Sequence, residues 1–196
     1  MAANDNKVKF GLTNVHYAKI TGWSADGLTP SYADPIRIPG AVTLSMDPSG
    51  ENENFYADNG VYYVVNNNAG YEAELEIAIT PQIFAVDILG EKMDNNGLLV
   101  ENVNAETSEF ALLWEFEGDK NHIRHISYRC SASRPGVNGQ TTEDSKTPQT
   151  DTLSMKAVAL PSGHVKAKTT PSTDSTVYNE WYDSVHLPDF SVTTAP

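Results

Sequence analysis

The sequence predicts a mainly β fold, a sandwich or barrel with one or two short flanking helices and long loop or terminal arms. Short segments that alternate apolar and polar residues recur along the chain, separated by turns rich in Gly, Pro, Asn and Asp. The alternation of strand and helix that builds parallel sheets is missing. We therefore expect one domain over residues 1–196, with about nine mostly antiparallel strands.

The segment 71–79 has the clearest strand pattern in the chain. Its apolar residues occupy every second position, so one face of the strand is predicted to be buried and the other to carry carboxylates. The apolar set is Tyr71, Ala73, Leu75, Ile77 and Ile79, and the acidic set is Glu72, Glu74 and Glu76. A metal ion would need further ligands from elsewhere, because glutamates two apart on a strand lie about 7 Å from each other.

The residues 54–65 predict a hairpin. Two runs rich in aromatic and β-branched residues flank Asn59-Gly60, a pair that readily adopts the positive φ angles of a type I′ turn.

The central part of the chain, from Glu109 to Leu160, organises the rest. It predicts a strand at 109–117, a turn at 118–121, a returning strand at 122–130, a long polar loop and a third strand at 153–160. Further strands are expected at 7–20 (broken at Gly11), 41–46, 98–101 and 164–168, the last after a turn at 161–163.

Two short helices are expected. Thr80-Pro81 predicts an N-cap and first helical residue for a helix over 81–89, which ends at Gly90 and buries Ile83, Phe84, Ile88 and Leu89. A second helix over 176–185 would place Val177, Tyr178, Trp181, Tyr182 and Val185 on one side.

Three segments lack regular patterning and are expected to be long arms. Residues 20–40 and 131–150 are loops rich in Gly and Pro, and residues 189–196 form a flexible C-terminal tail. Loops of this length in a small domain are usually functional or mobile.

The composition is that of an ordinary folded domain, with 39% hydrophobic and 20% charged residues. No apolar run is long enough for a membrane helix, and the first seven residues lack the apolar core of a secretory signal, so we expect no membrane association and synthesis in a cytoplasm. A single cysteine, Cys130, excludes an internal disulfide and is expected to be a small buried apolar side chain.

The charge is unevenly distributed. The net charge is −13, which argues against sequence-independent binding to nucleic-acid phosphates. Sixteen acids and one base (Lys92) lie between Asp47 and Asp119, whereas eight bases and three acids lie between Lys120 and Lys168. Either these are solvated faces of unequal sign, or they are complementary patches on a subunit that assembles head to tail.

No pattern predicts catalysis, a cofactor or a metal site. His122 and His125 are three apart, so on a strand their rings would point to opposite faces and could not hold one ion. Phosphate-binding Gly-rich loops, Gly-x-Ser-x-Gly and His-Glu-x-x-His are all missing from the sequence. We expect a protein that is not an enzyme.

Several segments, in their shared order, resemble the major tail tube protein of long-tailed phages (siphoviruses) that infect Gram-positive bacteria. The most distinctive is Phe-Ala-Leu-Leu-Trp-Glu-Phe-Glu-Gly-Asp at 110–119, followed by Tyr-Arg-Cys at 128–130 and Ser-Arg-Pro at 133–135. The others lie at 7–18, 55–58, 71–79, 87–90, 143–145, 148–150 and 181–185.

The resemblance implies a structural virion protein with a tail-tube-type β-sandwich. Six subunits would form a ring, and rings would stack into the tail tube around the tape measure protein, in contact with the tail terminator and distal tail proteins. DNA would pass through the lumen without specific binding. The family has no catalytic residues.

Candidate positions follow for the lumen and for contacts between subunits. Acidic faces suit a lumen that DNA must not adhere to, and the candidates are Glu72, Glu74, Glu76, Glu115 and Glu117. The basic candidates for contacts between subunits are Arg124, Arg129, Arg134 and Lys146, and the loops 20–40 and 131–150 are candidates for contacts between rings. The alternative function is a receptor- or carbohydrate-binding β-sandwich module of a phage baseplate, with Tyr62, Tyr63 and Trp181 as candidate binding aromatics.

Overall fold

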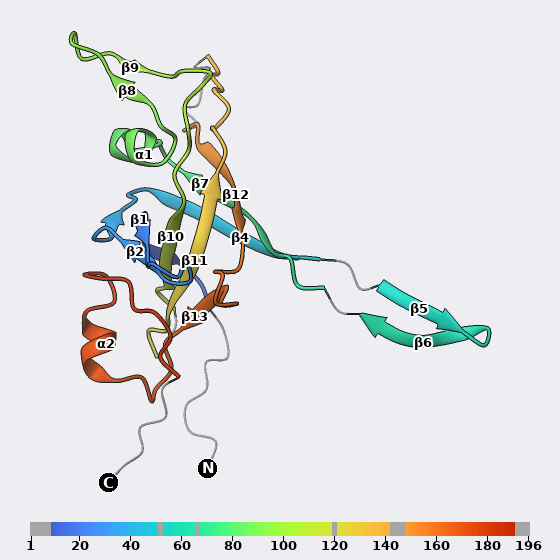
Figure 1. Ribbon diagram of the computed structural model, residues 1–196. Helices are drawn as coiled ribbons and strands as arrows, with labels where there is room; N and C mark the ends of the chain where they lie inside the picture. Colours follow the sequence, from blue (N-terminus) through green and yellow to red (C-terminus); the bar gives the residue numbers. More distant parts are fainter. Residues whose placement is uncertain (1–8, 51–52, 66, 119–120, 142–147, 191–196) are drawn as a thin grey trace.

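A computed structural model describes residues 9–50, 53–65, 67–118, 121–141 and 148–190 and has the predicted mainly β architecture. A large antiparallel sheet has the strand order β2-β1-β10-β11-β12-β7-β4, with β3 also paired to β1 and β13 to β11 (Figure 1). Its strands are β1 (Leu12–Trp23), β2 (Pro30–Tyr32), β3 (Ile36–Arg37), β4 (Ala41–Ser49), β7 (Gly70–Ile77), β10 (Phe110–Phe116), β11 (Arg124–Ala132), β12 (Asp151–Ala157) and β13 (Lys166–Lys168).

Two separate hairpins project from this body. The first consists of β5 (Glu53–Ala57) and β6 (Gly60–Val65), and the second of β8 (Lys92–Met93) and β9 (Leu99–Val100). Two short helices complete the described chain, α1 (Gln82–Asp87) and α2 (Ser175–Asn179), and neither is long enough to cross a membrane. The thirteen strands of the described residues exceed the expected number of about nine, mainly because β2, β3 and β8 are very short and carry no alternating pattern.

Strand β7 confirms the alternation predicted for 71–79 as far as Ile77, where the strand ends; Ile79, predicted to be buried, is 75% exposed, and Tyr71 is only partly buried. Ala73, Leu75 and Ile77 are buried, whereas the acidic side chains between them face away from the core. The strand lies between β12 and β4, which pair with it on either side. The period-two pattern therefore predicted which face of β7 is buried, because a one-residue shift would exchange its two faces.

The larger hydrophobic core lies on the buried face of β7 and beneath α1. Tyr17, Phe84 and Phe110 form its centre, with edge-to-face ring pairs at centroid distances of 5.0, 5.6 and 6.4 Å. The Tyr17 hydroxyl donates a hydrogen bond to Asp87 Oδ2 at 2.9 Å. Helix α1 thus closes one side of the sheet.

Two details of the α1 prediction are wrong. Ile83 is 49% exposed and not buried, because Phe84, Ala85, Ile88 and Leu89 supply the buried side. Thr80 does not cap the helix: its backbone N–H and its hydroxyl both donate to Asp151 Oδ2 at 2.8 Å, and Pro81 takes the N-cap position. A long-range partner has replaced the local cap.

A second core covers the opposite face of the sheet. Ala18, Leu113, Ile126 and Tyr128 contact the C-terminal segment, of which Trp181 is the most buried member, at 5% exposure. Helix α2 is shorter than the predicted 176–185, since turns continue the segment after Asn179. Its N-cap is Asp174, whose carboxylate accepts hydrogen bonds from Thr176 N and Val177 N.

The segment 20–40 is more regular than expected. Strands β2 and β3 both pair with β1, and the Tyr32 hydroxyl donates to Tyr128 O at 2.7 Å. Ile38 is only 2% exposed. This segment therefore folds back onto the sheet, and part of the predicted arm is body.

Candidate functional site

The most distinctive surface of the molecule is the hairpin formed by β5 and β6, which we call the β5–β6 arm. It extends away from the end of β4 and β7, and in Figure 1 no other labelled element lies beside it. Among the described strands, β5 and β6 pair with each other and with no third strand. The arm is therefore a two-stranded ribbon without a supporting layer.

The turn at the tip of the arm explains why a hairpin forms here. Ala57 pairs with Gly60, so the two-residue loop is Asp58-Asn59, one position earlier than the predicted Asn59-Gly60. Both loop residues have positive φ angles, 51° and 62°. Asp and Asn tolerate this conformation better than most residues, and a type I′ turn requires it at both positions.

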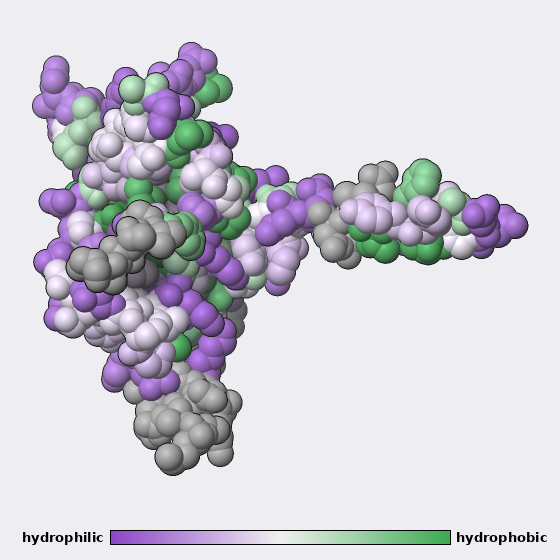
Figure 2. Space-filling view, turned by 60° about the horizontal axis from the view of Figure 1, so that its bottom comes forward, coloured by the Kyte–Doolittle hydropathy of each residue, from purple (hydrophilic) through white to green (hydrophobic). Residues whose placement is uncertain are grey.

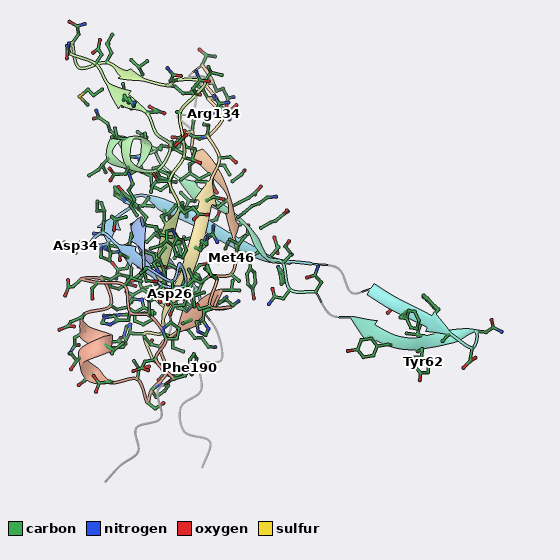
Figure 3. The ribbon with its side chains drawn as sticks, viewed as in Figure 1. Asp26, Asp34, Met46, Tyr62, Arg134 and Phe190 are labelled. Atoms are coloured by element: carbon green, nitrogen blue, oxygen red, sulfur yellow. The ribbon has the colours of Figure 1, made fainter. Side chains whose placement is uncertain are left out.

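The arm exposes large apolar side chains on both of its faces. The exposed fractions are 60% for Phe55, 65% for Tyr56, 53% for Val61, 73% for Tyr62, 64% for Tyr63 and 42% for Val64. In Figure 2, hydrophobic colour follows one side of the arm and hydrophilic colour gathers at its tip. In Figure 3 the side chain of Tyr62 lies far from those of the body. Such an apolar surface is typical of an interaction site.

A second candidate surface is the polar outer face of β4, β7 and β12. We call Glu72, Glu74 and Glu76 the acidic row, and the structure places all three on this face. Their cross-strand neighbours are mostly small and polar: Thr43, Ser45 and Asp47 on β4, and Thr152, Ser154 and Lys156 on β12. The face contains no aromatic side chain from these positions.

Hydrogen bonds hold part of the acidic row in place. Glu76 accepts from the hydroxyls of Thr43, at 3.0 Å, and Thr150, at 2.7 Å. Glu72 lies 3.8 Å from Lys156 Nζ, but both side chains are about 70% exposed, so the contact adds little stability.

Glu115 and Glu117, the other acidic candidates, lie in different surroundings. The Glu115 side chain is only 12% exposed, accepts a hydrogen bond from Asn14 Nδ2 and lies 3.5 Å from Arg124 Nε. Glu117 is exposed next to Gly11. Glu115 is therefore largely shielded from solvent, whereas Glu117 is exposed. Neither lies on β7, the strand that carries the acidic row.

The arginines predicted for contacts between subunits all have partners within the chain. Arg124 lies over the rings of Tyr178 and Tyr182, at 4.1 and 5.1 Å, besides its contact with Glu115. This cluster joins the C-terminal segment to the sheet, and burial raises the pKa of the Tyr182 hydroxyl.

Arg129 and Arg134 lie nearer the surface. Arg129 binds both carboxylate oxygens of Glu109 at 2.9 Å, and Arg134 pairs with Glu101. Lys146 lies outside the described residues, as does part of the predicted loop 131–150. A role of these cations between subunits stays a prediction.

An open groove of about 1010 Å³ lies between the polar face and residues 101–107. Asp47, Glu72, Glu74 and Glu101 contribute acids to its walls, whereas Arg134 and Lys156 contribute bases. Serine and threonine hydroxyls line the remainder together with a few apolar side chains. The lining contains no histidine or cysteine, so the groove offers no nucleophile–base pair of the usual kind.

Cys130 and His125, two side chains that could be reactive, are packed in the hydrophobic core and on an aromatic ring, respectively. Cys130 is 2% exposed, and burial raises the pKa of its thiol to about 11, so the reactive thiolate is scarce near neutral pH. The His125 ring stacks on Trp114 at 5.4 Å. Within the described ranges, no group of three or more His, Cys, Asp or Glu residues is placed to hold a metal ion.

Sequence reasoning missed one apolar surface. Around α1 and the β8–β9 hairpin, eight apolar residues are between 37% and 92% exposed. We call this set the α1/β8–β9 patch; its members are Ile79, Ile83, Val86, Met93, Leu98, Leu99, Val100 and Val103. The run Leu98-Leu-Val100 was visible in the sequence, but a short apolar run does not reveal whether a strand is buried.

No family model and no curated protein matches the sequence. Among solved structures, the chain is similar to the tube-terminating cap of the anti-feeding prophage, determined by cryo-electron microscopy, with a TM-score of 0.48 and 7% sequence identity. The match covers 87% of this chain and 98% of that one.

Proposed function

We propose that this protein is a structural subunit that assembles with copies of itself into the tube of a phage tail. Stacked hexameric rings would form a hollow conduit through which DNA leaves the virion. The sequence resemblance to the major tail tube protein of siphoviruses suggests this function, and the β5–β6 arm is the observation in the structure that supports it best.

The arm supports assembly because it is poorly suited to a monomer. Its four aromatic side chains are 60% to 73% exposed. An isolated two-stranded hairpin is at best marginally stable in water, and an exposed strand edge invites pairing with another chain. A neighbouring copy would provide the missing layer and would cover the aromatic surface.

The position of the arm favours a head-to-tail assembly. It projects from one end of the β4–β7 pair, and we propose that it contacts a different surface of another copy; an arm-to-arm contact would be two-fold and would close the assembly at a dimer. A heterologous contact that closes by rotation gives a ring, and one that repeats by translation gives a filament. Stacked rings require contacts of both kinds.

The polar face of β4, β7 and β12 is the proposed luminal surface. The acidic row would repel the DNA backbone, and its neighbours on β4 and β12 are hydroxyls and one acid apart from a single cation, Lys156, which lies 3.8 Å from Glu72. Glu117 is exposed enough to contribute, whereas Glu115 is committed to Asn14 and Arg124. We place the acidic row, rather than Glu115, against the lumen.

The proposed partners follow from this arrangement. Copies of the chain itself form the tube, the tape measure protein fills it during assembly, and the tail terminator and distal tail proteins close its two ends. The protein would be made in the host cytoplasm and would act in the virion.

The structure weakens the case for a baseplate binding module. Trp181 is only 5% exposed and packs in the second core, so it cannot bind a sugar. Tyr62 and Tyr63 are exposed, but they lie on a projecting ribbon rather than in a concave site. Assembly explains these two aromatics better than carbohydrate binding does.

Sedimentation velocity and negative-stain electron microscopy of the purified protein test the proposal. Long hollow tubes or stacked rings that grow with concentration are the expected result. A protein that stays as discrete small oligomers at all concentrations would refute tube formation and would favour a binding module.

A further inference from the structure

The pair Asn-Gly occurs three times in the chain, at 59–60, 96–97 and 138–139. This pair is reactive, because glycine has no side chain to keep its backbone nitrogen away from the side-chain carbonyl carbon of the preceding asparagine. The reaction needs a Gly amide that is not held in a hydrogen bond and an Asn side chain that can turn towards it. The surroundings of each pair therefore decide whether it reacts.

Asn96 and Gly97 are both held by Asp94 in the turn of the β8–β9 hairpin. The Asn96 side chain donates from Nδ2 to Asp94 Oδ2 at 3.1 Å, and its backbone N–H donates to Asp94 Oδ1 at 2.8 Å. The Gly97 N–H donates to the backbone oxygen of Asp94 at 3.1 Å. This turn must open before the pair can react.

Asn59 and Gly60 are held at the tip of the β5–β6 arm. Asn59 has a φ angle of 62°, and Gly60 pairs with Ala57 across the two-residue loop. In a turn of this kind the residue that follows the loop donates its amide hydrogen to the residue that precedes it. This pair, too, can react only after its turn opens.

Asn138 and Gly139 have no comparable restraint. They lie in the largely exposed stretch 133–141, which contains no helix, strand or turn. Val137, which precedes them, is 100% exposed, and a Cβ atom placed on Gly139 would meet no atom within 4 Å. Among the residues that the structure describes, none forms a hydrogen bond with the Asn138 side chain or with the Gly139 amide. This pair can therefore react without any prior opening.

We propose that Asn138 is a site of spontaneous modification, at which a carboxylate replaces the side-chain amide. The Gly139 nitrogen attacks Asn138 Cγ, so that a bond forms between these two atoms and the bond from Cγ to Nδ2 breaks. Nδ2 leaves as ammonia with the proton that the Gly139 amide gives up, and a succinimide ring remains. Water then adds to either carbonyl of the ring and opens it, which gives aspartate or isoaspartate. Water is the sole co-reactant, and nothing is oxidised or reduced.

The modification changes both the charge and the backbone of this stretch. Arg134 is the one charged residue between Ser131 and Thr141, and it pairs with Glu101 beside the polar groove. A carboxylate at position 138 therefore brings the net charge of the stretch from one positive charge to zero. Isoaspartate also directs the main chain through the former side chain and lengthens it by one carbon atom. The protein becomes heterogeneous in this loop as it ages, whether or not it forms tubes.

Peptide mapping by mass spectrometry, after incubation of the purified full chain at mildly alkaline pH, tests the proposal. The peptide that contains Asn138 should convert at least about tenfold faster than the peptide that contains Asn96, because only Asn96 depends on the opening of a turn. Chromatography should resolve an aspartate and an isoaspartate product, as a succinimide intermediate requires. Equal rates at the two sites, or aspartate without isoaspartate, would overturn the proposal.

A comparison with the unfolded chain separates the effect of the structure from that of the sequence. In guanidinium chloride, where the turns are lost, Asn59, Asn96 and Asn138 should convert at similar rates. If Asn138 kept its lead in the unfolded chain, the neighbouring sequence and not the fold would select it, and the structural argument would fail.

Two variants test the restraint and the attacking atom one at a time. Asp94→Ala removes the carboxylate that holds Asn96, so it should accelerate conversion at Asn96 and leave Asn138 unchanged. Gly139→Val hinders the attacking nitrogen in a place with open space, so it should slow conversion at Asn138 alone. Both variants should unfold at the wild-type temperature. An unaltered rate at Asn96 in the first variant, or at Asn138 in the second, would contradict the assignment.

Discussion

Replacing Phe55 with serine should weaken assembly about 100-fold without unfolding the subunit. The Phe55 side chain is 60% exposed in the isolated chain and lies opposite Tyr63 on the arm. A fully exposed aromatic side chain offers roughly 200 Å², so a contact that covers the arm buries about 120 Å² more of Phe55. At about 25 cal/mol per Å² this burial is worth about 3 kcal/mol, which corresponds to a factor of about 100 in affinity.

The critical concentration for tube formation, measured by sedimentation, reports this loss directly. The free energy of unfolding should change by less than about 1 kcal/mol, because the native subunit loses only a cross-strand pair. Phe190→Ser removes an aromatic ring that is even more exposed but lies outside the arm. If the two variants had critical concentrations within twofold of each other, the arm could not be the assembly element.

Three further predictions concern the lumen, the pH dependence and the core. Reversing the acidic row, Glu72, Glu74 and Glu76 all to Lys, should slow DNA ejection from virions while leaving tubes intact; an unchanged ejection rate would count against the luminal assignment. Burial lowers the pKa of His16, so its contribution to stability is present above about pH 6.5 and is lost as the pH falls through the lowered pKa. His16→Gln should therefore reduce the loss of unfolding free energy on acidification, and an unaltered pH profile would contradict the assignment. Leu75→Ala should cost about 2 to 5 kcal/mol in chemical denaturation, because the side chain is fully buried; a cost below about 1 kcal/mol would mean that this core is loosely packed.

The elements with strong local signals were predictable from the sequence. The period-two pattern of β7 identified the strand and its buried face, because one face of a sheet must exclude water. The hairpin of the arm followed from its turn residues, with an error of one position in the loop.

The details that depend on distant residues were not predictable. Thr80 appeared to be an N-cap, but Asp151 on another strand accepts its hydrogen bonds. Ile83 was predicted to face the core together with Phe84, Ile88 and Leu89, but the helix turns Ala85 inward instead and leaves Ile83 49% exposed. Local preference decides only where no tertiary contact competes.

In the candidate site, too, the features set by local pattern were predictable and those set by distant residues were not. The sequence placed the acidic row on one face because the strand pattern required it. It could not show that Glu115 is shielded by Asn14 and Arg124, since these residues come from other strands. The aromatic residues of the arm interrupt the alternation on both strands, which in retrospect distinguishes a ribbon exposed on both faces from a half-buried strand.

A cryo-electron microscopy reconstruction of the assembled protein tests the central claim most directly. The account predicts a hollow tube in which every β5–β6 arm lies against a neighbouring copy and the acidic row faces the channel. Arms that point into solvent, or an assembly without a central channel, would contradict it.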